Sequence, residues 1–309
     1  MSENNGRNRG GWSKAGLAYL DRVIEILDGL ADYWPLTLRQ VYYQLVASGA
    51  IANNLGEYSK LSRILTKARL DGYVSWDAME DRTRATLNSD GWTDQGHFIE
   101  DELDNFLTGY RRDLLQTQAA ALEVWVEKDA LSRVCHNVAY PYCVPVIVAR
   151  GFSSITYVHE CRKRVKANAD EGKRTVILYF GDLDPSGWAM LPAMLETLQG
   201  EMVLGDLVEG KRCALTVEQV GAYNLPRNPD ALKPTDTRAK KYMARFGDLA
   251  VELDALPPAT LESLVRGAIE TNLDLSKYEV ERQLEKQERA RIAAIRHEVN
   301  ELIGTIKGG

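Results

Sequence analysis

Hydrophobic positions near the start of the chain recur every three to four residues, which is the pattern of amphipathic helices. The first run lies between Trp12 and Leu30, and Pro35 follows its end. Its apolar positions are Leu17, Leu20, Ile24 and Leu27. Thr37 is a suitable N-cap for a second helix, and Gly49 is a suitable stop. We therefore predict two helices in this region.

A third helix is predicted for residues 56–72, with one apolar side and one basic side. Its apolar positions are Leu61, Ile64, Leu65 and Ala68. Its basic positions are Lys60, Arg63 and Lys67. The segment 73–84 is short, partly alternating and flanked by turn residues, as a wing or β-hairpin would be. We predict that residues 12–118 form a winged-helix-like unit and that residues 1–11 are a disordered tail.

From residue 119 onward, short apolar runs alternate with helical segments. The expected strands are 121–128, 144–151, 175–184 and 213–220, and the expected helices between them are 129–138, 153–172 and 186–199. Strands joined by helical crossovers form parallel sheets that are covered on both faces. The predicted fold class is therefore α/β, with this domain at 119–255 and a helical C-terminal extension at 256–309.

Composition limits the function only weakly. The chain of 309 residues is 45% hydrophobic and 27% charged, as a globular protein is. Its net charge of -6 does not indicate nucleic-acid binding, so a DNA-binding surface must come from local clusters of Lys and Arg. No apolar run reaches the ~20 residues of a membrane span, and the N-terminus lacks the apolar core of a signal peptide. We expect a cytoplasmic protein without a membrane partner.

Acidic residues follow two of the predicted strands directly. Asp182 and Asp184 lie in the segment GDLDPSG after one strand, and Glu127 follows another. Because the carboxyl ends of parallel strands meet at one edge of a sheet, we expect these acids to lie together. Magnesium is held by one or two carboxylates together with water and phosphate, so they are candidate magnesium ligands. A solvated turn without a metal is the alternative interpretation.

The strings EVWVEKDAL and LYFGDLDPSG together resemble a Toprim domain, the α/β module of topoisomerases, bacterial primases and certain nucleases. In that family the glutamate after the first strand and the Asp-x-Asp pair bind the metal. The resemblance implies that Glu127, Asp182 and Asp184 bind Mg²⁺ here. A primase is not expected, because the chain lacks the zinc module and the long extension of primases.

The string LTLRQVYYQL, which precedes the Toprim-like segment, resembles the catalytic helix of the topoisomerase VI A subunit and of the related meiotic double-strand-break protein. The resemblance implies that Tyr43 attacks the DNA backbone and that Arg39 is the matching arginine. A phenol with a pKa near ~10 needs a neighbouring base or cation to react at neutral pH. We expect Arg39 to lower that pKa or to hold the phosphate, and we interpret Tyr42 as a core residue.

This resemblance covers about residues 36–275 and is to small stand-alone proteins of phages and mobile elements. It implies a homodimer on double-stranded DNA in a bacterial cell or nucleoid, in which the tyrosine of one chain meets the acids of the other. The expected DNA-contacting residues are Arg39, Lys60, Arg63 and Lys67, with Arg69 as a further candidate. Glu252 and Asp254 are either auxiliary metal ligands or, as we prefer, acids of a structural turn. No segment resembles the ATP-binding B subunit, so strand passage would require a separate ATPase.

Three functions agree with these motifs. The first is Mg²⁺-dependent DNA cleavage by tyrosine transesterification, as in the A subunit of a type IIB topoisomerase, which leaves a phosphotyrosyl adduct. The second is a Toprim nuclease that hydrolyses DNA with metal-activated water while Tyr43 is structural. The third is a DNA-binding subunit without catalytic activity.

Overall fold

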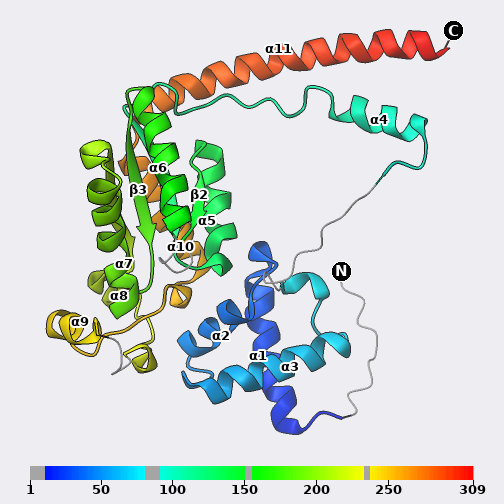
Figure 1. Ribbon diagram of the computed structural model, residues 1–309. Helices are drawn as coiled ribbons and strands as arrows, with labels where there is room; N and C mark the ends of the chain where they lie inside the picture. Colours follow the sequence, from blue (N-terminus) through cyan, green and yellow to red (C-terminus); the bar gives the residue numbers. More distant parts are fainter. Residues whose placement is uncertain (1–10, 81–90, 150–154, 233–236, 309) are drawn as a thin grey trace.

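The computed structural model describes residues 11–80, 91–149, 155–232 and 237–308. Three N-terminal helices form one group of elements and an α/β unit forms the other, while the long helix α11 (Leu275–Gly308) extends away from the α/β unit (Figure 1). Apart from Gly11, the predicted tail lies outside the described residues. The fold is therefore α/β, as predicted, with a separate helical group on the N-terminal side.

The three N-terminal helices are α1 (Lys14–Gly29), α2 (Leu38–Ala47) and α3 (Leu55–Leu70). The predicted N-cap of α2 is confirmed: the Gln40 N–H donates to Thr37 Oγ1 at 3.3 Å, and the Thr37 N–H donates to Gln40 Oε1 at 2.8 Å. These reciprocal bonds are a capping box, which satisfies backbone donors that a helix start leaves free. The core of this helical group is continuous with the core on one face of the sheet.

The predicted wing is not seen as a β-hairpin in the described residues 73–80. Trp76–Ala78 form a short 3-10 helix, and Met79 makes a single parallel bridge with Leu36. The Leu36 N–H donates to Ala78 O at 2.9 Å, and the Glu80 N–H donates to Leu36 O at 3.0 Å. This segment therefore pairs with the residues before α2 rather than with itself. Residues 81–84 lie outside the described residues, so the winged-helix assignment stays a prediction.

The α/β unit contains a parallel sheet, as the alternating pattern predicted. Its four strands lie in the order β2-β1-β3-β4. Its strands are β1 (Ala120–Val126), β2 (Val146–Val148), β3 (Arg174–Phe180) and β4 (Val208–Ala214). The strand predicted at 213–220 is wrong. Thr216 there starts helix α8 (Val217–Ala222) with a second capping box, so the apolar residues after it belong to a helix.

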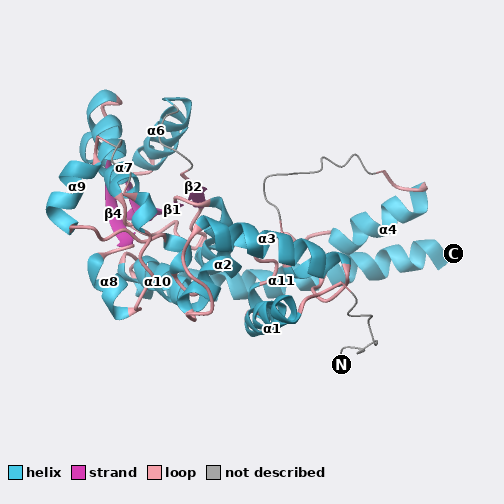
Figure 2. Ribbon diagram, turned by 90° about the horizontal axis from the view of Figure 1, so that it is seen from below, coloured by secondary structure: helices cyan, strands magenta, loops and turns pink. Residues whose placement is uncertain are grey.

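Helices cover both faces of the sheet (Figure 2). One face carries α5 (Ser132–Ala139) and α10 (Pro258–Thr271), and the other carries α6 (Ile155–Asp170) and α7 (Pro185–Glu196). Alternate strand residues serve different cores: Val124 and Leu178 face α5 and α10, whereas Trp125 faces α6 and α7. This arrangement leaves the carboxyl ends of the strands as an open edge for a site.

The remaining α-helices of the described chain were predicted only in part. The predicted helical extension at 256–309 is observed as α10 and α11. Helix α4 (Gln95–Asn105) and helix α9 (Ala239–Phe246) were not predicted. Among the described residues, no helix combines the length and the apolar character needed to cross a bilayer.

Candidate functional site

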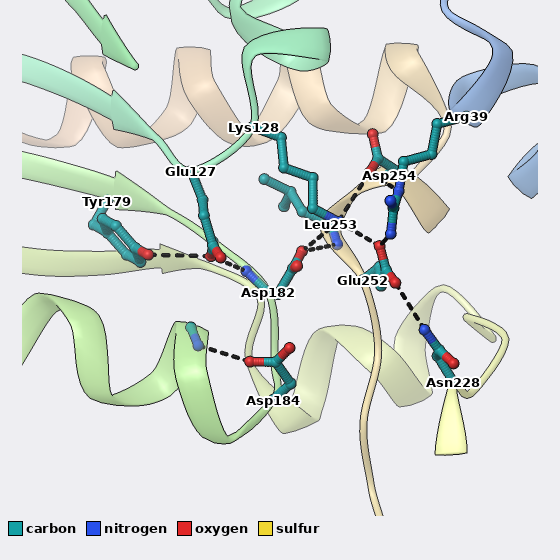
Figure 3. Close-up of polar contacts among 12 residues, drawn as sticks. Arg39, Glu127, Lys128, Tyr179, Asp182, Asp184, Asn228, Glu252, Leu253 and Asp254 are labelled. Atoms are coloured by element: carbon teal, nitrogen blue, oxygen red, sulfur yellow. Dashed lines mark hydrogen bonds and ion pairs between the residues drawn. The ribbon is translucent and has the colours of Figure 1, made fainter. Parts of the chain in front are cut away.

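The acids predicted from the sequence lie at the carboxyl ends of β1 and β3 (Figure 3). Glu127 follows β1, and its Oε2 atom accepts the Asp182 N–H at 2.9 Å and the Tyr179 hydroxyl at 3.2 Å. The Glu127 N–H donates to Phe180 O at 2.9 Å, which extends the pairing of the two strands to this point. Strand register therefore brings Glu127 and the loop after β3 together, as the sequence predicted.

Asp182 connects this loop to a distant segment of the chain. Its Oδ1 atom accepts the Leu253 N–H at 2.7 Å, and Leu183 forms a β-bridge with Val251. These contacts bring Glu252 and Asp254 to the same edge of the sheet (Figure 3). We refer to Glu127, Asp182, Asp184, Glu252 and Asp254 together as the acid cluster.

A lysine that we did not predict lies within the acid cluster. The Lys128 Nζ atom is 2.9 Å from Asp182 Oδ1, 2.5 Å from Glu252 Oε2 and 2.9 Å from Asp254 Oδ2. Burial alone would lower the pKa of Lys128, but the negative charges of Asp254 and Asp182 outweigh it and raise that pKa above its ordinary value. Lys128 therefore remains charged and joins three carboxylates.

The helix that carries the tyrosine contacts the same cluster. Arg39 on α2 forms an ion pair with Glu252, and its Nε atom lies 3.0 Å from Asp254 Oδ2. On the other side, Asn228 Nδ2 donates to Glu252 Oε1 at 2.7 Å. Helix α2 therefore adjoins the acid cluster of its own chain, through a residue predicted to act with Tyr43.

Asp184 has a different local role from the other acids. Its Oδ1 atom accepts the Gly187 N–H at 2.7 Å and so caps the start of α7. Burial raises the pKa of Asp184. Gly187 is needed at this turn, because a Cβ there would lie 2.5 Å from Asp182 O and 2.9 Å from Glu127 Oε2. The glycine thus allows the acid-bearing loops to approach each other.

Glu127 has a strongly shifted proton affinity. Burial and the negative charge of Asp182 raise the pKa of Glu127 to about 7. The carboxyl group therefore changes its protonation near neutral pH. Such a shift is common for acids in catalytic sites.

The carboxylates of the acid cluster are suitable ligands for a hard cation, but their positions in the structure are less suitable. Three of the five carboxylates form ion pairs with Lys128 or Arg39, and Asp254 Oδ1 is buried without a hydrogen-bond partner among the described residues. Oxygen ligands of this kind suit Mg²⁺. Across the part of the chain that the structure describes, however, no three His, Cys, Asp or Glu side chains are grouped closely enough to hold one ion. Lys128 occupies the space between three of the acids.

Tyr43 is a buried side chain with a hydroxyl that resists ionisation. It is 3% exposed, and burial raises its pKa to about 12, although the positive charges of Arg39 and Lys128 act to lower it. Tyr43, Arg39 and Glu252 line one pocket of about 510 Å³ between the N-terminal helices and the α/β unit. Tyr42 is a core residue, as predicted, and its hydroxyl donates to Asn53 Oδ1 at 2.9 Å.

The predicted basic face of α3 is present, but its charges are partly neutralised. Lys60 lies 3.3 Å from Glu57 Oε1, and Lys67 lies 2.6 Å from Asp71 Oδ2. Arg63 forms only a long hydrogen bond, from its Nε atom to a main-chain oxygen at 3.4 Å. The additional candidate Arg69 stacks over the Trp76 ring at 4.3 Å. These residues do not contact the acid cluster.

Sequence reasoning missed two cations that organise the site, Lys128 and Arg212. Arg212 on β4 donates to the main-chain oxygens of Gly187 at 3.0 Å and of Asp182, so it supports the acid-bearing loop. Lys128 had a usable signal, because it directly follows a predicted metal ligand at a strand end. Arg212 had none, since its partners are main-chain atoms of a distant loop.

Comparison with known proteins adds no family to this description. No protein-family model matches the chain, and neither a curated protein nor a solved structure gives a significant match. The function is therefore inferred from the acid cluster, the Tyr43 helix and the residues around them.

Proposed function

We propose that this protein cleaves DNA by transesterification, with Tyr43 as the nucleophile and the acid cluster as the electrostatic part of the same active site. One observation carries the proposal: Tyr43, Arg39 and Glu252 line a single pocket, and Arg39 is ion-paired with Glu252 and Asp254. A nucleophile, a phosphate-binding cation and a set of carboxylates are the parts that phosphoryl transfer requires.

In the proposed reaction the Tyr43 oxygen attacks a backbone phosphorus atom. A phosphotyrosyl bond forms, the bond from phosphorus to the leaving nucleotide oxygen breaks, and the phenol proton passes to water or to a carboxylate of the acid cluster. The guanidinium of Arg39 can bind a phosphate through two parallel hydrogen bonds once it exchanges its carboxylate partners for the substrate. Because the phosphotyrosyl bond conserves the energy of the broken linkage, the reverse reaction reseals the strand.

The family resemblance assigns magnesium to Glu127, Asp182 and Asp184, although the described residues do not group these side chains closely enough to hold one ion. When bound, the ion would neutralise charge on the phosphate and on the leaving oxygen. Lys128 holds Asp182 through an ion pair of 2.9 Å, so its ammonium group competes with any cation for that carboxylate. Lys128 therefore offsets the repulsion among Asp182, Glu252 and Asp254 in the metal-free protein.

A second candidate function is hydrolysis of DNA by metal-activated water, with Tyr43 in a structural role. The burial of Tyr43 and its pKa of about 12 favour this alternative, because a buried phenol is a weak nucleophile at neutral pH. Both functions use the acid cluster, so the role of Tyr43 distinguishes them.

The test is a search for DNA covalently bound to the protein. End-labelled supercoiled DNA is incubated with the protein and Mg²⁺, the mixture is denatured, and label that remains on the protein is measured. We expect the wild type to retain label, Tyr43→Phe to lose it, and the adjacent control Tyr42→Phe to keep it. Cutting that survives Tyr43→Phe and disappears with Asp182→Asn would establish the hydrolytic alternative. Absence of cutting with any divalent metal would contradict both functions.

Cleavage of both strands needs two nucleophiles, so we propose that the active species on double-stranded DNA is a homodimer. The contacts of Arg39 within one chain support a site that is built from a single chain. Tyr43→Phe and Glu127→Gln chains, mixed so that subunits exchange, should then remain inactive. Recovery of single-strand nicking would instead show that the two chains share each site, as the family resemblance implies.

A further inference from the structure

One part of the molecule projects away from the sheet and buries almost no apolar side chains. We define the arm as residues 92–107, which include α4, together with residues 286–303 of α11. In both ribbon views α4 lies beside the far part of α11, away from the sheet (Figures 1 and 2). A hydrogen bond from Arg296 to Asp104 O joins the two helices, and no residue of α4 is buried.

Helix α4 is too short to be stable without a partner. It has 11 residues, whereas isolated helices shorter than ~12–15 residues are marginal in water. Its segment also exposes large apolar side chains, namely Trp92, Phe98, Ile99, Phe106 and Leu107. The Trp92 and Phe98 rings contact each other at 4.7 Å, but this contact leaves the rest of the surface open. An exposed apolar surface of this kind marks an interaction site.

The two parts of the arm carry opposite charges. Residues 92–107 contain no Lys or Arg and five acids, Asp94, Glu100, Asp101, Glu102 and Asp104. Residues 286–303 contain four basic residues, Lys286, Arg289, Arg291 and Arg296, and three acids, Glu288, Glu298 and Glu301, so this half is weakly positive. The α11 part also exposes Ile295 and Leu302, the latter 65% exposed. The surface that complements α4 in charge and in apolar character is therefore α11.

The α11 of the same chain does not cover α4, because the apolar residues of α4 remain exposed beside it. We propose that the arm is a self-association surface, on which α4 of each chain docks against α11 of a second copy. A two-fold pair satisfies both halves at once, since each chain supplies one acidic and one basic helix. This inference does not depend on the proposed chemistry and concerns the protein without DNA.

The first test measures the mass of the full-length protein by sedimentation or light scattering across a range of concentrations. We expect a dimer for the wild type and at least a tenfold weaker dimer for Ile99→Glu, with unchanged circular dichroism outside the loss from α4. Val203→Glu is the control, because Val203 is 83% exposed and lies outside the arm. A monomeric wild type, or a dimer that Ile99→Glu leaves intact, would overturn the proposal.

The second test separates docking between chains from docking within one chain. One variant carries Glu100→Lys with Glu102→Lys, and the other carries Lys286→Glu with Arg291→Glu. Each variant alone weakens the opposite charge on one helix, α4 in the first and α11 in the second, so each should associate more weakly than the wild type. Mixed, one contact pairs the introduced lysines with the introduced glutamates and the other contact keeps the wild-type charges, so differently tagged chains should copurify as a heterodimer. No association in the mixture would overturn the proposal, because contacts within one chain cannot be repaired by another.

Discussion

The acid cluster and the basic face of α3 both contain several charged side chains, but the two regions differ in how these charges are paired and buried. Lys128 contacts three carboxylates from distant segments and is largely buried. On α3, Lys60 and Lys67 each contact one acid within a single helical turn and stay partly exposed. Water and salt screen exposed pairs, whereas buried charges interact strongly and leave a large penalty when one is removed. Burial therefore decides which charges act together.

Removal of Lys128 should have the largest effect. Lys128→Met leaves Asp182, Glu252 and Asp254 without their shared counterion, and loss of one partner from a buried ion pair costs about 3–5 kcal/mol of unfolding free energy. Urea denaturation in EDTA measures the change. The control is Lys163→Met, which removes an exposed pair with Glu160, and its effect should be far smaller. Equal losses in the two variants would show that Lys128 acts as a surface charge.

Glu127 should make the stability of the folded protein depend on pH. Its pKa is raised from 4.5 to about 7, so the folded protein retains a proton that the unfolded chain releases between these values. Stability therefore falls as pH rises from 4.5 to 7. Glu127→Gln should remove this fall and stabilise the metal-free protein above pH 7 by on the order of 3 kcal/mol. If the stability of the wild type and of Glu127→Gln changed in parallel from pH 4 to 8, the raised pKa of Glu127 would be refuted.

The close approach of the acid-bearing loops should depend on Gly187. Gly187→Ala places a methyl group against Asp182 O and Glu127 Oε2, and overpacking of this kind costs about 1–3 kcal/mol. Gly267→Ala in α10 is the matched control, because no atom lies within 4 Å of its added Cβ and alanine favours helices. Thermal unfolding should show opposite signs for the two variants. A shift of the same sign in both would mean that Gly187 is not sterically required.

Substitutions on the basic face of α3 should have the smallest effects, and these are measured as changes in DNA binding. Arg63→Gln should lower the slope of log affinity against log salt by about 0.9 if Arg63 contacts a phosphate. Lys60→Gln and Lys67→Gln should lower it less, because Glu57 and Asp71 already neutralise these lysines. The control is Arg174→Gln, at the start of β3 and thus at the sheet end opposite the site. A triple variant with an unchanged slope would exclude this face from DNA contact.

Local signals in the sequence determined many of the elements and the position of the first acids. Thr37 and Gln40 lie within four residues of each other, so the start of α2 is visible in one short segment. Buried parallel strands read as continuous apolar runs, which identified β1 and β3. Because side chains that follow such strands lie at one edge of the sheet, the proximity of Glu127 and Asp182 was also predictable.

Only the tertiary structure decided how those acids are held and which residues join them. β4 is an edge strand with a polar sequence, so it has no apolar run to identify it, and Arg212 on it was missed. Arg39 and Glu252 are 213 positions apart, and Lys128 and Glu252 are 124 apart. Contacts over such separations depend on how the sheet and helices pack in space. No local pattern of hydrophobic and polar residues encodes that packing, whereas a helix cap such as Thr37 with Gln40 depends on neighbouring residues alone.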